Sequence, residues 1–259
     1  MERFILANIC LTRYYKKQNC YIKDILLEIL TRYYYLIKLK VSLGLGTYGY
    51  VYSRRGYVWG DNQLGQLGLT GEYYNKPHLL PLTGVKKIKF GKSFMLILTD
   101  QGLYYTGLNN DLAKLAEKKL QFSFISANVK MFDCYMDNFI IVDNDIITNR
   151  LKVNLPNVRK VYCTSRKFYA LTDRLYELEN LREVDKIDFD KDKVYTSLKN
   201  QYPFFEINSQ EYVCKQKALA VNCSGDNFIY ATGNKICTGR VYMSSVGKIQ
   251  MLNYGEYKF

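Results

Sequence analysis

An internal repeat constrains the fold of this chain more than any other feature of its sequence. Residues 39–69 and 86–109 follow one order: an alternating strand ending in glycine, a second apolar strand, a short turn and a third strand. Weaker copies follow at 129–149, 158–180, 193–214 and 218–240, and the C-terminal KIQMLNYGEYKF matches only the first two strands. Because one such unit cannot bury its apolar face alone, the units must pack on one another.

The number of copies predicts the architecture. The residues that end the first strand of each unit are Leu43, Phe90, Cys134, Cys163, Thr196, Cys223 and Met251. Short alternating strands joined by turns at this period are typical of a β-propeller. We therefore expect an all-β fold, a seven-bladed β-propeller with shortened blades, in which units three to seven are short enough for three-stranded blades.

The N-terminal segment is expected to complete the ring. The last unit lacks a closing strand, and RFILAN at residues 3–8 has a suitable pattern, so pairing of the first strand with the last would remove free sheet edges. Residues 9–40 form an insertion that the repeat does not explain. Apolar residues at helical spacing predict one amphipathic helix across about 20–37, packed on the propeller. The whole chain, 1–259, is interpreted as a single domain.

A glycine-rich stretch raises the question of nucleotide binding. GLGTYGYVY, residues 44–52, fits the pattern G-x-G-x-x-G and resembles the glycine-rich, phosphate-binding loop of a protein kinase. A kinase also needs an H-R-D catalytic loop and a D-F-G site, whereas the only histidine is His78 and no D-F-G occurs. The repeat explains Gly44 as a strand end instead. We therefore expect no enzyme activity, no cofactor and no metal site.

The turns between the second and third strands are also predicted by glycine. SRRG and TDQG place Gly56 and Gly102 where a positive φ is easy. Arg54 and Arg55 then lie on an exposed hairpin tip.

The charge of the chain favours an anionic partner. The net charge is +13, although residues 173–192 carry more acids than bases. This asymmetry predicts a basic face opposite an acidic flank, suited to a phosphate backbone. RYYKKQN at 13–19 also mixes bases with aromatic residues, a pattern that suits stacking. The candidate partner-binding residues are Arg13, Lys16, Lys17, Arg54, Arg55, Lys86, Lys87, Lys89 and Lys92.

The stretch GYVWGDNQLGQLGL, residues 56–69, resembles the signature of the regulator of chromosome condensation repeat family. Pro77, LLPL at 79–82 and the glycine-ended strand at 88–91 follow in the order of that family. The resemblance implies a seven-bladed β-propeller, and its best-known member is a guanine-nucleotide exchange factor for a Ran-type GTPase. The residues that match the repeat pattern are Trp59, Gly60, Asn62, Gly65 and Gly68.

Two functions remain open at this point. The first is a non-enzymatic binding module that docks a basic face on a nucleoprotein, either ribosomal RNA or chromatin, with protein partners. The second is an exchange factor for a small Ran-like GTPase, for which the loops 110–124 and 181–193 are candidate wedges. Seven cysteines without C-x-x-C predict reduced thiols, and no apolar run approaches a membrane span. We expect a cytoplasmic or nuclear protein.

Overall fold

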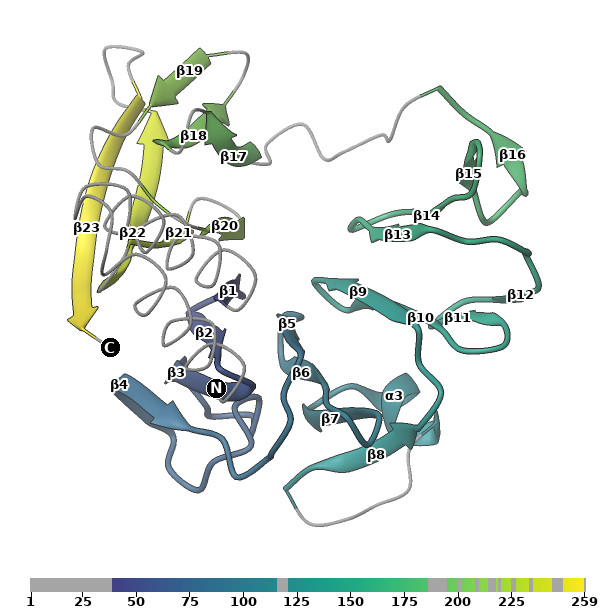
Figure 1. Cartoon of the computed structure of the whole chain (residues 1–259), viewed down its shortest axis with the longest axis horizontal. Coiled ribbons are helices and arrows are strands. Elements are labelled where there is room, and N and C mark those ends of the chain that lie inside the picture. Colours follow the sequence, from purple (N-terminus) through teal and green to yellow (C-terminus); the bar gives the residue numbers. More distant parts are fainter. Residues whose placement is uncertain are drawn as a thin grey trace, which may run out of the picture.

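A computed structural model describes residues 39–115, 121–185, 195–199, 202–207, 210–213, 218, 220–224, 227–232, 235–243 and 249–258. Within these ranges the strands form six antiparallel sheets, five of four strands and one of three, which we call blades one to six in chain order (Figure 1).

Blade one contains β1 (Lys40–Leu43), β2 (Thr47–Tyr52), β3 (Arg55–Asp61) and β4 (Tyr73–Leu79). Blade two contains β5 (Lys87–Phe90), β6 (Phe94–Leu98), β7 (Leu103–Gly107) and β8 (Ser123–Ser126). Blade three contains β9 (Met131–Tyr135), β10 (Asn138–Val142), β11 (Ile146–Thr148) and β12 (Lys152–Val153). Blade four contains β13 (Lys160–Cys163), β14 (Phe168–Leu171), β15 (Leu175–Glu177) and β16 (Arg182–Glu183). Blade five contains β17 (Tyr195–Lys199), β18 (Tyr202–Ile207) and β19 (Gln210–Val213). Blade six contains β20 (Ala220–Ser224), β21 (Asn227–Ala231), β22 (Lys235–Met243) and β23 (Ile249–Lys258).

The blades are arranged around a centre. In Figure 1 the first strand of each blade lies nearest the middle, and the later strands lie progressively outward. These innermost strands contact one another between blades, β1 with β5, β5 with β9, β9 with β13, and β17 with β20. β20 also contacts β1, so blade six packs beside blade one. Blades radiating from their first strands confirm the predicted β-propeller.

The C-terminal stretch, predicted to be a seventh unit, does not form a blade of its own among the described residues. The stretch taken as a seventh unit forms one strand, β23, which pairs antiparallel with β22 from Lys235↔Lys258 to Met243↔Ile249. It is the outer strand of blade six. The error has a physical cause, because an outermost strand and an innermost strand have the same alternation of side chains.

The expectation of three-stranded blades is met only in part among the described residues, since blades three, four and six have four strands each. Blade five has three described strands, whereas blades three and four keep a fourth strand of only two residues. Short outer strands fit a brief repeat and leave little edge open to pairing. The predicted closing strand at 3–8 and the predicted helix at 20–37 lie outside the described residues.

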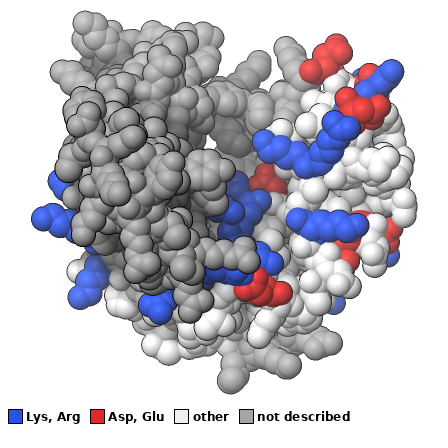
Figure 2. All heavy atoms as spheres, in the orientation of Figure 1, with Lys and Arg blue, Asp and Glu red and all other residues white. Residues whose placement is uncertain are grey.

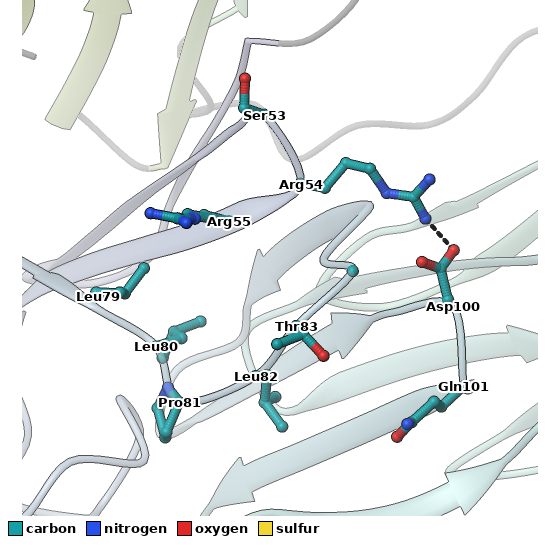
Figure 3. A pocket seen from close by; sticks show the side chains of 11 residues that line it. Ser53, Arg54, Arg55, Leu79, Leu80, Pro81, Leu82, Thr83, Asp100 and Gln101 are labelled. Atoms are coloured by element: carbon teal, nitrogen blue, oxygen red, sulfur yellow. Dashed lines mark ion pairs between the residues drawn. The ribbon is translucent and has the colours of Figure 1, made fainter. Parts of the chain in front are cut away.

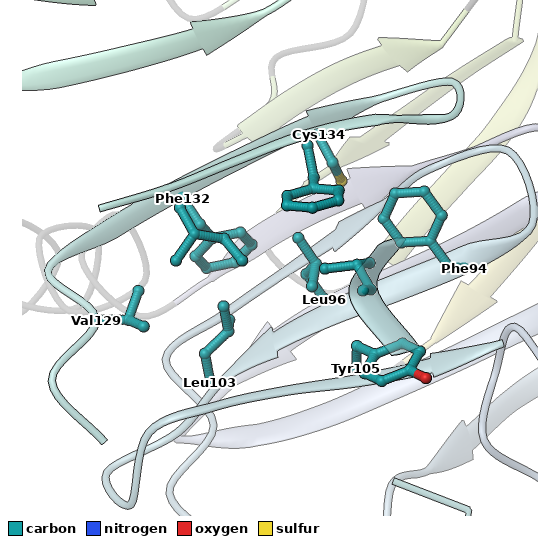
Figure 4. Packing of buried hydrophobic residues seen from close by; sticks show 10 residues of the cluster. Phe94, Leu96, Leu103, Tyr105, Val129, Phe132 and Cys134 are labelled. Carbon is teal, nitrogen blue, oxygen red and sulfur yellow. The ribbon is translucent and has the colours of Figure 1, made fainter. Parts of the chain in front are cut away.

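The hydrophobic core lies between the blades. One cluster joins blade two to blade three and includes Phe94, Leu96 and Leu103 from one side and Phe132 and Cys134 from the other (Figure 4). Further clusters join blades one and two, three and four, and six and one. Blades one, two and three therefore each contribute an apolar face to both neighbours, as the repeat requires.

The signature residues shape the loop after β3. Asn62 is buried, and its Nδ2 donates to the carbonyl oxygens of Leu69 (2.8 Å) and Gly71 (2.5 Å), while its Oδ1 accepts from the N–H of Leu67 (2.7 Å). The hydroxyl of Thr106 donates to the Gly65 carbonyl oxygen at 2.8 Å, which ties this loop to blade two. The signature is therefore a structural motif that holds blade one against blade two.

The same position carries asparagine in later blades. The Oδ1 of Asn109 accepts hydrogen bonds from the N–H groups of Asp111 and Leu112, and Asn109 thereby caps the helix α3 (Asn110–Leu115). Its Nδ2 donates to the Asp137 carbonyl oxygen in blade three at 3.1 Å. Asn149 and Asn180, at the matching places of units three and four, bond other side chains. The repeat thus preserves an amide whose partners change from blade to blade.

The turn before β3 differs from the prediction for Gly56. The positive φ angles fall on Ser53 (47°) and Arg54 (64°), which form a two-residue turn of the primed kind. Gly56 lies within β3, where a Cβ would meet the side chains of Leu80 and Ile88. The matching prediction for Gly102 is confirmed by its φ of 137°.

Candidate anion-binding face

The repeat places the beginnings of the innermost strands on one face of the propeller. In blades two, three and four, the residue just before the first strand donates its N–H to the carbonyl oxygen of the last residue of the second strand. These bonds join Lys86 to Leu98 (2.7 Å), Lys130 to Val142 (2.8 Å) and Arg159 to Leu171 (2.7 Å). We call this side, which also holds the turns between second and third strands, the start face, and the other side the opposite face.

Basic residues dominate the start face of blades one to four. Basic residues there are Lys40, Arg54, Arg55, Lys86, Lys87, Lys130, Lys152, Arg159, Lys160 and Arg174, and acidic residues are Asp100, Asp143, Asp145, Asp173, Glu183 and Asp185. The opposite face is balanced, with Lys92, Lys114, Arg150, Arg166, Lys167 and Arg182 against Asp61, Glu72, Asp111, Asp137, Glu177 and Glu179. Figure 2 shows basic side chains near the middle of the molecule and over the blades that contain β9 and β13.

Much of the acidic charge on the start face is already paired. The carboxylate of Asp100 forms ion pairs with Lys86, at 3.2 Å, and with Arg54. These two cations hold the pKa of the Asp100 carboxyl below its ordinary value. Lys152 contacts Asp145 at 2.9 Å, and Arg174 contacts Glu183 at 2.7 Å. Considering described residues only, no carboxylate lies within ion-pair distance of Arg55, Lys130, Arg159 or Lys160, all of which are exposed. These four cations are therefore open to an external anion.

Two lysines of the predicted set have a structural role instead of an exposed one. Lys87 is partly buried, with its Nζ donating to the Phe132 carbonyl oxygen at 2.7 Å and lying 4.5 Å from the centroid of the Phe132 ring. Lys89 forms an ion pair with Asp133 at 3.1 Å, and this carboxylate raises the pKa of Lys89. Both side chains connect blade two to blade three.

These contacts belong to a polar series that follows the inner strands. In each case a side chain on one innermost strand contacts the next blade in the same rotational sense. The donor and acceptor pairs are Asn222 to the Val41 carbonyl, Lys40 to the Lys86 carbonyl, Lys87 to the Phe132 carbonyl, and the Cys163 N–H to Asp133 Oδ2. The inner surface of the propeller is thus hydrogen-bonded from blade six to blade four.

The position of Lys87 predicts a pH dependence of stability. Burial lowers its pKa from 10.5 to about 8, and the neighbouring Lys89 ammonium contributes. Between these values the unfolded chain binds one proton more than the folded protein, so stability rises with pH. Relative to Lys87→Met, we expect the wild-type protein to gain stability from about pH 7.5 to about pH 9.5, measured by urea unfolding. Lys86→Met is the matched control. If the difference in unfolding free energy between the wild-type protein and Lys87→Met does not change with pH, this assignment is wrong.

The remaining predicted residues are separated from this face. Lys92 lies on the opposite face, in the turn after β5, and its N–H donates to the Met136 carbonyl oxygen at 2.8 Å. Arg13, Lys16 and Lys17 lie outside the described residues. The sequence analysis missed Lys130, Arg159 and Lys160. The signal that identifies them is the repeat register, since a basic residue immediately precedes the first strand in units two, three and four.

The described ranges contain neither a metal-binding cluster nor a membrane-spanning helix. No group of three or more histidine, cysteine, aspartate or glutamate residues in those ranges could hold a metal ion. No helix within them is long and apolar enough to cross a membrane. Cys134, Cys163 and Cys237 are buried, and burial raises the pKa of the Cys134 thiol above its ordinary value.

Comparison with known proteins finds similarity only at the level of structure. No family model and no curated protein sequence matches the chain. Human WBSCR16 is 14% identical with a TM-score of 0.47, covering 85% of this chain and 81% of that one. Prp20p from Saccharomyces cerevisiae is 13% identical with a TM-score of 0.42, covering 71% of this chain and 53% of that one. Hsv2 from Kluyveromyces lactis is 6% identical with a TM-score of 0.39, covering 85% of this chain and 99% of that one.

The assignment of the fold rests on the sheets and on the signature loop. The meandering sheets radiate from their first strands. Trp59 and Gly60 lie within β3, and Asn62, Gly65 and Gly68 lie in the loop after it, which is hydrogen-bonded to blade two. The chain is a divergent β-propeller whose first two blades carry a repeat that resembles the regulator of chromosome condensation family.

Proposed function

We propose that this protein is a non-enzymatic β-propeller binding module that docks the start face of blades three and four on an anionic nucleoprotein, ribosomal RNA or chromatin, in the cytoplasm or nucleus. The observation that carries the proposal is the row of exposed cations Lys130, Arg159 and Lys160, which have no carboxylate partner in the described part of the chain. RNA and DNA share the phosphate backbone that such a row would contact, without base readout.

The geometry supports contact with a phosphate backbone in particular. Lys130 and Arg159 occupy equivalent positions in neighbouring blades, so the repeat presents positive charge at a regular interval. Lys160 lies 4.7 Å from the centroid of the Tyr162 ring, a contact that orders its side chain. The balanced opposite face makes the charge a property of one surface and not of the whole molecule.

The test compares two triple variants of equal net charge. Lys130→Glu/Arg159→Glu/Lys160→Glu changes the start face, and Lys92→Glu/Lys114→Glu/Arg166→Glu changes the opposite face. Binding of labelled single-stranded RNA and duplex DNA is measured by anisotropy across a salt series. We expect the start-face variant to bind at least about tenfold more weakly at low salt and to reduce the salt slope by roughly 2 to 3, while the control keeps both.

The outcomes separate the possible partners. Stronger binding of RNA than of DNA would favour the ribosome, and the reverse would favour chromatin. Equal losses in both variants would mean that only net charge matters and would contradict a dedicated face. Retention of a nucleotide-free small GTPase from native extract, unaffected by the start-face variant, would replace this proposal with the exchange-factor hypothesis.

A further inference from the structure

A second feature of the start face is a cavity of about 810 Å³ between blades one and two. It lies beneath the β2–β3 turn and beside the loop after β4, away from Lys130, Arg159 and Lys160. Its lining residues are Ser53, Arg54, Arg55, Asp100, Gln101 and residues 79–84 (Figure 3). We propose that this cavity binds an acidic peptide segment of a partner protein, with a large apolar side chain against Leu79 and Leu82 and an adjacent carboxylate on Arg55.

The frame of the cavity is fixed by backbone bonds. The N–H of Leu80 donates to the Gly56 carbonyl oxygen at 2.8 Å, and the N–H of Val85 donates to the Arg54 carbonyl oxygen at 2.9 Å. The loop between them is therefore held at both ends against the start of β3. Leu80 is buried in the core between blades one and two, which anchors the floor. A cavity that exists before binding spares a ligand the cost of ordering it.

One wall of the cavity is apolar and open. Leu79 remains 51% exposed at the end of the outer strand β4, and the exposed Pro81 follows it. Leu82 is partly buried against the core between blades one and two. An exposed leucine beside a preformed cavity favours a ligand that covers apolar surface, because burial of that surface stabilises the complex. A phosphate backbone alone would leave this wall uncovered.

The rim of the cavity has an excess of positive charge. Arg54 and Lys86 share the single carboxylate of Asp100, and Arg54 turns toward it in Figure 3. Arg55 lies across from Leu79 and Leu80 in that view, and among described side chains no carboxylate neutralises it. A guanidinium next to an apolar wall suits bidentate binding of a carboxylate that flanks an apolar residue. A peptide with both groups meets both halves of the cavity.

The experiment selects ligands from a random linear peptide library displayed on phage, using the full chain as bait. Arg55→Glu/Leu79→Asn serves as the counter-bait, since both residues are exposed and neither change should disturb folding. We expect enriched peptides that place a large apolar residue beside aspartate or glutamate. Absence of such peptides, or equal capture by the counter-bait, would overturn the proposal.

Affinity measurements then separate the two halves of the cavity. For a selected peptide, Arg55→Glu and Leu79→Asn should each weaken binding by about tenfold, as should neutralising the peptide acids or replacing its apolar residue with serine. The matched controls are Arg166→Glu and Leu64→Asn, because Leu64 is 49% exposed in the loop after β3, which leaves from the opposite face. If Leu79→Asn has no effect, the interaction is purely electrostatic and the proposed site is wrong. Nucleic-acid binding through blades three and four does not depend on either result.

Discussion

Gly60→Ala is expected to destabilise the protein by more than about 3 kcal/mol, enough to unfold much of a marginally stable population. Gly60 has a φ of 108°, and a Cβ at this position would run into the carbonyl group of Gly46 and the Cα of Thr47. Gly46 ends the turn between β1 and β2 and Thr47 begins β2, and this backbone is fixed by the bond from the Asp61 N–H to the Gly46 carbonyl oxygen at 3.0 Å. The collision involves backbone and cannot be relieved by a change of rotamer.

Gly65→Ala is the matched control for this prediction. Gly65 also has a positive φ, 71°, but a Cβ there would meet no atom within 4 Å. The Gly65→Ala substitution should lower the free energy of unfolding only by the strain of a left-handed backbone, about 1 to 2 kcal/mol. Urea unfolding followed by circular dichroism measures both variants. Equal losses would show that backbone strain alone requires glycine at Gly60, and the close approach of the two strands would then be unimportant.

Asn62→Ala is expected to cost about 3 kcal/mol and to release the loop after β3. The substitution leaves the Leu69 and Gly71 carbonyl oxygens and the Leu67 N–H without their present partner, and an unsatisfied buried polar group typically costs 1 to 3 kcal/mol, although this loop can regain part of the loss from water. Because Leu67 is fully buried in the core between blades one and two, release of the loop should also loosen that interface.

Asn75→Ala provides the comparison, since Asn75 is exposed on the outer strand β4. Hydrogen exchange of the Leu67 amide reports the loop directly, and urea unfolding reports the whole protein. We expect faster exchange at Leu67 and a lower unfolding midpoint for Asn62→Ala only. If the two variants unfold at the same urea concentration, then Asn62 is not the residue that holds blade one together.

Asn62→Asp tests which half of the amide matters. Aspartate keeps an acceptor for the Leu67 N–H but turns a carboxylate toward the carbonyl oxygens of Leu69 and Gly71. Like partial charges then face each other in a buried site, so this variant should be at least as unstable as Asn62→Ala at neutral pH.

The site was partly predictable for the same reason that the fold was. Arg54 and Arg55 were predicted from an exposed hairpin tip and Lys86 from the basic residues around a first strand, and the structure places all three on the start face. Lys92 is equally close in sequence but lies on the opposite face, because a four-residue strand separates the two ends of β5. Lys130 and Arg159 are distant in sequence and adjacent only through the repeat, so linear clustering could not reveal them.

The sequence by itself determined the kind of fold and its local chemistry. Side-chain alternation, glycines and turns within each unit specify antiparallel meanders, and the repeat requires that such meanders stack. The tertiary structure alone decided that Ile249–Lys258 closes blade six, that Lys87 and Lys89 connect blades, and that Arg55 borders a cavity. These facts depend on pairing partners and burial, which arise from residues far apart in the chain and leave no mark in local periodicity.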